Sequence, residues 1–217
     1  SDDVCGAAHG STQRLVDTIT TEFGVPIDHV VVIGFTGFSS LVDDLGGLRI
    51  NFPVAERDTY TGLDVTPGCQ TLSGAQALSF VRSRHVERFV SGVWHRDAPS
   101  DLERVSDEQL ALRQLAAAAV ARAGTDPRPL LETLFNNVTV DSAFTSNDAL
   151  TLFEALRAEH DATTLTLPVV SHDAGDLAGL VLAPGAQNVL DALAGRAALS
   201  PPTGPVGATL PPIASAC

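Results

Sequence analysis

Arginine provides all of the basic side chains in this sequence, with thirteen arginines and no lysine. Six of them lie between residues 82 and 113, where they balance six carboxylates, and the rest of the chain carries the formal charge of −13. A guanidinium suits phosphate because it is planar, donates two parallel hydrogen bonds and keeps its charge. The alternative is a solvated surface of arginine–carboxylate pairs, each worth about 0–1 kcal/mol. The six are Arg82, Arg84, Arg88, Arg96, Arg104 and Arg113.

The spacing of these arginines suggests two separate contributions to one anion site. In Arg82-Ser83-Arg84 the arginines are two positions apart, so on extended backbone their side chains would share a face and hold one diphosphate. Asp101 and Arg104 are one helical turn apart at the predicted start of a long helix, where Asp101 would cap the helix or orient Arg104. The amides of that helix end also favour anions. Phosphate binding and surface ion pairing both remain open from spacing alone.

Composition limits the class of protein. A chain of 217 residues with 44% hydrophobic content can bury a core as one domain. A pI near 4.6 argues against a nucleic-acid partner, which would need a basic face. No run of 18 apolar residues is present to span a membrane. The chain starts at Ser1 and has no methionine, so we expect a processed product or a fragment, compatible with a signal or anchor upstream.

Three cysteines permit one disulfide with one thiol left over, and their spacing fits no metal motif. A pair between Cys5 and Cys69 would suit an extracytoplasmic protein, whereas three free thiols, with Cys217 the third, is the simpler interpretation. The cysteine count therefore does not decide the compartment.

Hydrophobic periodicity predicts an alternation of helices and strands, which is typical of a layered α/β domain. Helices are expected over residues 11–23, 37–45, 73–81, 100–123, 129–135, 147–158 and 187–193. Strands are expected over 30–35, buried on both faces, and over 48–52, 138–140 and 163–170. We expect a polar loop with at most a short extended piece over 53–68, an irregular segment over 86–100, and a flexible proline-rich tail over 196–217.

Several motifs occur in an order that resembles the LytR-CpsA-Psr family. They are Ile27-Asp28-His29, Phe35-Thr36-Gly37-Phe38 and the acidic segment 41–47 that ends in two glycines. A Pro-Gly turn at 67–68, a Leu-x-Gly-x-x-Ala-Leu helix start at 72–78 and the Arg-x-Arg of Arg82 and Arg84 follow. Asp101 to Arg104 fits the family's Asp-x-x-Arg, and 163–168 and 179–193 are similar to its last strand and helix. The likeness covers about residues 4–195.

The resemblance implies a layered αβα domain with a mixed central β-sheet flanked by helices. Members are bacterial envelope proteins, held by an N-terminal membrane helix with the domain on the extracytoplasmic face. They transfer glycopolymers from a polyprenyl-diphosphate carrier to a peptidoglycan acceptor, with the lipid tail in an apolar pocket, and the sequence suggests an actinobacterial member. The alternative is a binding protein for polyprenyl phosphate that has lost transfer. A transcriptional regulator fits poorly with pI 4.6.

Residue roles follow from the same resemblance. Arg82 and Arg84 would bind the diphosphate, Arg104 would assist at the leaving group, and Asp101 would hold Arg104 or Arg84 in position. Accessory roles are considered for His85, Glu108 and Gln109.

The sequence also departs from the family pattern. The upstream half, with an Asp-bearing strand and a Pro-Arg-Asp motif, has no counterpart, so residues 1–195 are expected to be a catalytic domain without its N-terminal segment. The family's Mg²⁺ is expected, but its ligands are not in this chain. Where the family continues Arg-x-x-Arg-Gln, Arg104 is followed by Asp107 and Glu108, and Glu108 could pair with Arg104. His29 and Asp43 are expected to have structural roles, in a turn and at a helix end.

Overall fold

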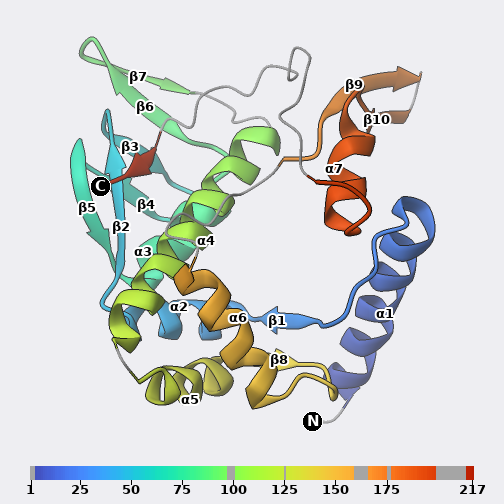
Figure 1. Cartoon of the computed structure of the whole chain (residues 1–217). Helices are drawn as coiled ribbons and strands as arrows, with labels where there is room; N and C mark the ends of the chain where they lie inside the picture. The colour runs from blue at the N-terminus through green and yellow to red at the C-terminus, as the bar shows by residue number, and fades with distance from the viewer. Residues whose placement is uncertain (1–2, 97–100, 125, 159–165, 175–176, 199–213) are drawn as a thin grey trace. The chain divides into compact units, whose positions relative to one another are not determined.

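Helices and strands alternate in the computed structural model, which confirms the α/β class (Figure 1). The structure describes residues 3–96, 101–124, 126–158, 166–174, 177–198 and 214–217, and within these the side chains of 3–9, 101–103, 171–174 and 177–178 are left undescribed. The chain divides into two compact units, residues 1–28 with 165–208 and residues 29–164 with 209–217. We call them unit 1 and unit 2.

Unit 2 contains three groups of paired strands, all antiparallel among the described residues. One sheet has the order β11-β2-β5, with β2 (Leu48–Phe52), β5 (Gly68–Leu72) and β11 (Ser215–Ala216). Another has the order β4-β3-β6-β7, with β3 (Glu56–Asp58), β4 (Leu63–Val65), β6 (Glu87–Val90) and β7 (Val93–Arg96). The third pairs β1 (Val31–Ile33) with β8 (Val138–Val140).

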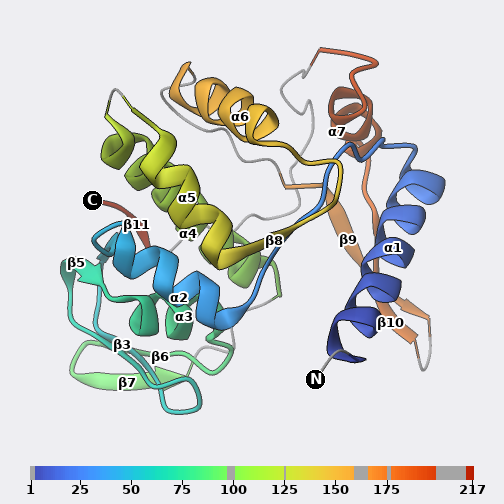
Figure 2. The same ribbon diagram turned by 90° about the horizontal axis from the view of Figure 1, so that it is seen from below.

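Five helices complete unit 2: α2 (Phe35–Asp44), α3 (Gly74–Arg82), α4 (Asp101–Ala123), α5 (Arg128–Asn137) and α6 (Ser146–Ala158). Helix α3 packs against β5, and α4 packs against β2 and β11 (Figure 2). The core lies between these layers, where inward side chains of the strands meet those of the helices. It includes Val42, Leu48, Ile50, Phe52, Leu63, Val65, Leu72, Ala77, Phe80, Leu110, Ala111 and Ala214.

Two glycines allow α2 to approach its neighbours closely. A Cβ on Gly74, the first residue of α3, would overlap the backbone carbonyl oxygen of Ser39 in α2. A Cβ on Gly37 would overlap the carbonyl oxygen of Asn137 at the end of α5. Asp43 secures the first contact, because its Oδ1 accepts the backbone N–H of Gly74 at 2.7 Å. The expected structural role of Asp43 is therefore confirmed.

Unit 1 consists of α1 (Asp3–Phe23), the antiparallel hairpin of β9 (Val169–Ala174) and β10 (Leu177–Leu182), and α7 (Ala186–Leu193). Arg196 joins two of these helices at their ends. Its Nη1 donates to the carbonyl oxygen of Gly24 after α1 at 2.7 Å, and its Nη2 pairs with Asp191 of α7 at 2.9 Å.

Most predicted helices agree with the structure, but several other predicted segments differ. The strand expected over 163–170 is displaced, because residues 166–168 form no strand and β9 begins at Val169. Residues 30–35 were expected to form a strand buried on both faces, yet β1 covers only 31–33 and its side chains are exposed, 50% for Val31 and 47% for Val32. This prediction is wrong because β8 is the strand that pairs with β1 among the described residues, and Phe35 already begins α2.

The loop expected over 53–68 contains β3, β4 and the start of β5. The alternation was hidden because the inward positions of β3 are the polar residues Glu56 and Asp58, which are 3% and 0% exposed. The segment over 86–100, expected to be irregular, forms the β6–β7 hairpin up to residue 96. Its turn is made by Ser91 and Gly92, both with positive φ, the geometry that favours a two-residue hairpin.

The tail expected over 196–217 lies mostly outside the described residues. Its last residues are an exception to the expected flexibility, because Ala214 is 2% exposed in the core and Ser215 pairs with Asn51 of β2.

Candidate functional site

Arg82 and Arg84 lie at the end of helix α3. The helix starts with a capping box, in which the Ser73 hydroxyl accepts from the backbone of Gln76 and the Gln76 side chain accepts from the backbone of Ser73. It ends at Arg82, and Ser83 is already extended, with φ −66° and ψ 125°. Arg82 is thus helical, so the prediction that the two arginines share one face of extended backbone is wrong.

Asp58 holds the backbone that carries Arg84. Its carboxylate accepts the N–H of Arg84 at 3.1 Å and of His85 at 2.9 Å, and also the N–H groups of Tyr60 at 2.8 Å and Thr61 at 3.4 Å. Burial alone would raise the pKa of Asp58, but the four backbone donors outweigh it and lower the pKa below its ordinary value. The ionised carboxylate of Asp58 therefore joins the turn at residues 60–61 to the segment at residues 84–85, which is distant in sequence.

Hydroxyl groups stabilise the same junction. The Thr61 and Ser83 hydroxyl oxygens are 2.9 Å apart, the Ser79 hydroxyl donates to the carbonyl of Thr61 at 2.8 Å, and the Ser83 hydroxyl donates to the carbonyl of Ser79 at 2.8 Å. Ser83 is buried between the two exposed arginines. The backbone of Arg82-Ser83-Arg84 is thus fixed while both guanidinium groups can reach solvent.

Arg82 also contacts the start of helix α2. Its guanidinium carbon lies 4.5 Å from the centre of the Phe35 ring, a cation–π distance. Phe35 is the first residue of α2, whose first turn has no acidic residue and no side-chain cap. An arginine and the positive end of a helix dipole therefore lie together, an arrangement that favours an anion.

His85 packs on Tyr60, with ring centroids 4.3 Å apart and both side chains exposed. The residue considered for an accessory role thus lies beside Arg84 in the loop that Asp58 holds.

Arg104 and Glu108 form an ion pair on α4, with Nη1 and Oε1 3.0 Å apart. The expected pairing is confirmed. Gln109 follows and is half-buried. The backbone of Asp101 begins α4, but its side chain lies outside what the structure describes, as does Ser100.

Other arginines of the 82–113 stretch take part in structural ion pairs. Arg88 is 6% exposed, and its Nε lies 3.2 Å from Glu56 Oε1. Arg96 lies 3.8 Å from Glu87, which also binds Arg57 at 2.8 Å. Arg96 therefore forms the kind of surface ion pair that the alternative predicted. Arg88 also forms an ion pair, but this pair is buried.

An apolar cavity of about 180 Å³ lies between helices α2, α4, α5 and α6. Leu41 of helix α2 and Leu45, which caps the C-terminal end of that helix, line the cavity, and Phe35 lies at the other end of the helix. All of the lining residues are apolar: Leu41, Leu45, Leu112, Leu115, Ala116, Ala119, Leu130, Leu131, Leu134, Phe144, Ala149, Leu152, Phe153 and Leu156.

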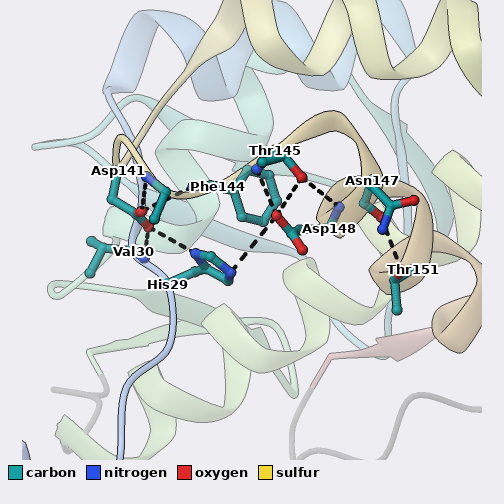
Figure 3. A network of polar contacts seen from close by, with 9 residues as sticks. His29, Val30, Asp141, Phe144, Thr145, Asn147, Asp148 and Thr151 are labelled. Atoms are coloured by element: carbon teal, nitrogen blue, oxygen red, sulfur yellow. Dashed lines mark hydrogen bonds and ion pairs between the residues drawn. The ribbon is translucent and has the colours of Figure 1, made fainter.

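His29 supports one wall of this cavity (Figure 3). Its ring stands edge-on to Phe144, with centroids 5.1 Å apart, and its Nδ1 lies 3.3 Å from Asp141. Its Nε2 lies 4.0 Å from Asp148, whose carboxylate accepts from the backbone and hydroxyl of Thr145. His29 therefore fixes the turn between β8 and α6, as expected, and places Phe144 in the cavity wall.

The described residues contain no group of three His, Cys, Asp or Glu side chains placed to hold a metal ion. This part of the chain therefore does not fit the Mg²⁺ that the resemblance implies, and no chemical step is assigned to a metal here.

Sequence reasoning missed the roles of Asp58 and Phe35, and it expected an apolar pocket only from the family resemblance, without its lining residues. A signal existed for Asp58, because an aspartate followed closely by Thr59, Tyr60, Thr61 and Gly62 is typical of a turn in which the carboxylate accepts backbone N–H groups. No local signal existed for Phe35 or for the cavity, because each depends on how helices pack.

Comparison with known proteins gives consistent results. The model described as "LytR_cpsA_psr family" matches residues 6–193. Cell wall biosynthesis protein LcpA of Corynebacterium glutamicum is 28% identical over 173 residues, 77% of this chain and 31% of that protein. Polyisoprenyl-teichoic acid–peptidoglycan teichoic acid transferase TagU of Bacillus subtilis is 38% identical over 77 residues, 36% of this chain and 24% of that protein.

A solved structure is similar as well. The LytR-Csp2A-Psr enzyme from Actinomyces oris has a TM-score of 0.66 and 27% identity, over 78% of this chain and 64% of that one. The chain thus matches at most about a third of these two curated relatives and just under two thirds of the solved chain.

Proposed function

Because the chain belongs to the LytR-CpsA-Psr family, we propose that it contributes to the transfer of a polyprenyl-diphosphate-linked glycopolymer to peptidoglycan. The substrate is amphipathic, with a dianionic head and a long apolar chain. A protein that binds it needs fixed cations next to an apolar cavity.

One observation carries this proposal: the candidate anion site and the apolar cavity lie at opposite ends of helix α2. Arg82 contacts Phe35 at the start of the helix, and Leu41 and Leu45 line the cavity towards its end. The helix has ten residues and so is about 15 Å long. A polyprenyl chain whose diphosphate lies at Arg82 can reach the cavity along this helix.

The arginines would act by electrostatics. When a bond to a diphosphate breaks, negative charge grows on the departing phosphate, and a fixed guanidinium offsets that charge without transferring a proton. In this proposal Arg82 and Arg84 bind the diphosphate, Arg104 assists at the leaving group and Asp101 orients an arginine. The backbone positions of Arg82 and Arg84 are prepared before the substrate binds, because Asp58 and Ser83 already fix the chain between α3 and β6.

We extend the proposal to the cell envelope, at the extracytoplasmic face of the membrane, because a polyprenyl carrier and peptidoglycan meet there. Among the described residues no helix has the length and apolar character needed to cross a bilayer. Magnesium is part of the proposal only as a family expectation, and ligands for it would have to come from outside the described residues.

A second candidate function is binding without transfer. The observation that favours it is the ion pair of Arg104 with Glu108, which competes with phosphate for the same guanidinium. The cavity and Arg82 would still retain a lipid phosphate.

Binding of a radiolabelled polyprenyl-diphosphate-linked glycan tests the head-group site. Arg82→Ala and Arg84→Ala should each weaken binding about tenfold or more, because a charged hydrogen bond is worth roughly 1.5–3 kcal/mol. Arg14→Ala, an exposed arginine of α1, is the control and should bind like the unmodified protein. Unchanged binding in both site variants would exclude the diphosphate role.

Release of the polyprenyl phosphate carrier from the same substrate with Mg²⁺ separates the two candidates. Turnover supports the transferase, whereas tight retention of ligand without turnover supports the binding protein.

A further inference from the structure

Tyr60 is an exposed aromatic residue in a turn whose backbone is firmly held. The residue is 72% exposed, although its backbone N–H donates to Asp58 Oδ1 at 2.8 Å. The N–H of Gly62, which has a φ of 79°, closes the same turn by donating to the carbonyl oxygen of Asp58 at 2.8 Å. The chain therefore presents a large ring to solvent from a fixed point between β3 and β4.

A second ring lies against the first. The rings of His85 and Tyr60 have centroids 4.3 Å apart and planes 34° apart, and both side chains are exposed. The backbone N–H of His85 donates to Asp58 Oδ2 at 2.9 Å. One carboxylate thus holds the backbone of both residues, one on each oxygen, and the contact between the rings restricts their rotation. We call Tyr60 and His85 the aromatic pair.

The aromatic pair lies next to the candidate diphosphate site. His85 directly follows Arg84, whose N–H donates to the same carboxylate at 3.1 Å. The turn that carries the other ring is attached to this segment as well, because the hydroxyl oxygens of Thr61 and Ser83 are 2.9 Å apart. A group linked to a phosphate at Arg84 can therefore lie beside the aromatic pair.

The chemistry of the aromatic pair suits a sugar. A hexose in its chair form has C–H groups on its faces, which pack on the negative face of an aromatic ring, and hydroxyl groups around its rim. The phenol of Tyr60 and a ring nitrogen of His85 can exchange hydrogen bonds with that rim. A tyrosine also loses little conformational freedom when a ligand binds. A lipid chain is a poorer match here than in the cavity, whose lining is apolar.

We propose that Tyr60 and His85 form a sugar-binding platform on which a hexose ring stacks beside the diphosphate site. This inference rests on the proposed function, since the diphosphate held at Arg82 and Arg84 brings the reacting sugars to the platform. The sugar comes from the lipid-linked glycan or from the glycan of the acceptor, and both offer the same faces and hydroxyl groups to the rings.

The platform would position a sugar and would take no part in breaking a bond. A ring stacked on Tyr60 keeps one orientation relative to the arginines, and orientation of this kind contributes to the rate of a transfer reaction. The aromatic pair would also select the group joined to the diphosphate, which the arginines by themselves do not distinguish.

Titration calorimetry with two probes tests the proposal. The probes are farnesyl diphosphate and farnesyl diphosphate that carries one glucose. The unmodified protein should bind the glucose-bearing probe about threefold to tenfold more tightly. Tyr60→Ala should remove this difference and leave the affinity for farnesyl diphosphate unchanged. Tyr60→Phe keeps the ring and should retain most of the difference.

A second titration distinguishes the two sources of the sugar. A soluble disaccharide fragment of peptidoglycan is added to protein that is saturated with farnesyl diphosphate. Weaker binding of this fragment in Tyr60→Ala, without a change for the glucose-bearing probe, would assign the platform to the acceptor. If Tyr60→Ala binds both sugar ligands like the unmodified protein, the proposal is wrong.

Phe89→Ala is the matched control. Phe89 is an aromatic residue of β6 that is 41% exposed, and it packs against Trp94 and not against the aromatic pair. This variant should keep the preference for the sugar ligands. Equal melting temperatures of Tyr60→Ala and the unmodified protein would show that the exposed ring is not needed for folding. Equal weakening of both farnesyl probes in Tyr60→Ala would contradict a sugar-specific role.

Failure of the platform differs from failure of the proposed function. If the diphosphate site is wrong, Arg82→Ala and Arg84→Ala bind farnesyl diphosphate like the unmodified protein. If only the platform is wrong, both arginine variants still lose affinity, and the added glucose makes no difference.

Discussion

The carboxylate of Asp58 and the backbone N–H of Arg84 are joined by a hydrogen bond of 3.1 Å across 26 positions of the chain. Asp58 ends β3 and Arg84 follows α3, so this bond connects the sheet β4-β3-β6-β7 to the helix that carries Arg82. The backbone of Arg84 is therefore attached directly to strand β3 of that sheet.

Replacing Asp58 with asparagine tests this connection. Asp58→Asn keeps the size but removes the charge and one acceptor oxygen, so we expect a loss of about 2 kcal/mol in the free energy of unfolding. Binding of a polyprenyl diphosphate should weaken as well, because Arg84 is less well placed. Asp64→Asn, at the exposed position of β4, is the matched control and should change the free energy by less than about 0.5 kcal/mol. Chemical denaturation measures both.

The dependence of stability on pH follows from the same carboxylate. The pKa of Asp58 is lowered from 3.8 on folding, so its contribution is complete above that value and is lost as the pH falls through the depressed folded pKa. The unmodified protein should lose stability below about pH 4, and Asp58→Asn should show a shallower loss over that range. Parallel pH profiles for the two proteins would show that Asp58 does not contribute.

Two carboxylates near the cavity should act in the same direction. The pKa of Asp141 is lowered chiefly by the backbone N–H of Val30, and that of Asp148 chiefly by the hydroxyl of Thr145. Their contributions explain why a shallower profile is expected in Asp58→Asn, and not a flat one.

Filling the cavity should separate tail binding from head-group binding. Ala116→Trp places a large ring among the lining residues, so affinity for a long polyprenyl phosphate should fall about tenfold or more, since burial of several methylene groups is lost. Affinity for a short-chain diphosphate should stay the same. Ala117→Trp, one residue further on the exposed side of α4, should affect neither. Equal affinity for the long chain in Ala116→Trp would show that the tail lies elsewhere.

Removing the acidic partner of Arg104 should strengthen anion binding. In Glu108→Gln the guanidinium loses its ion pair at 3.0 Å, and affinity for a diphosphate should rise about twofold to fivefold, the range expected for a partly exposed pair. Glu132→Gln, at an exposed position of α5, controls for the change in net charge. Titration calorimetry gives the comparison, and equal gains in both variants would indicate a general charge effect.

Close packing at Gly74 should be intolerant of a methyl group. Gly74→Ala would force the backbones of α2 and α3 apart at Ser39 and should cost about 1–3 kcal/mol. Gly10→Ala, in α1 with open space around the site, should instead stabilise the protein by about 0.5–1 kcal/mol. Opposite signs in thermal melts would support this account of the α2–α3 contact.

The sequence by itself determined the elements whose signals are local. The helix expected over 73–81 corresponds to α3, and alternating side chains predicted β2, because hydrophobic periodicity depends only on neighbours along the chain. The Arg82 and Arg84 pair and the Glu108 partner of Arg104 were also found in this way, as was the family.

Tertiary structure alone decided what depends on contacts between distant segments. The sequence predicted a loop at β3 because its inward residues, Glu56 and Asp58, are acidic. Burying these carboxylates costs free energy, and Arg88 and the N–H of His85, which lie far along the chain, offset that cost. The contact of Arg82 with Phe35 and the cavity between four helices likewise join residues far apart in sequence. These contacts depend on the free energy of packing of the whole fold, which no local stretch of sequence determines.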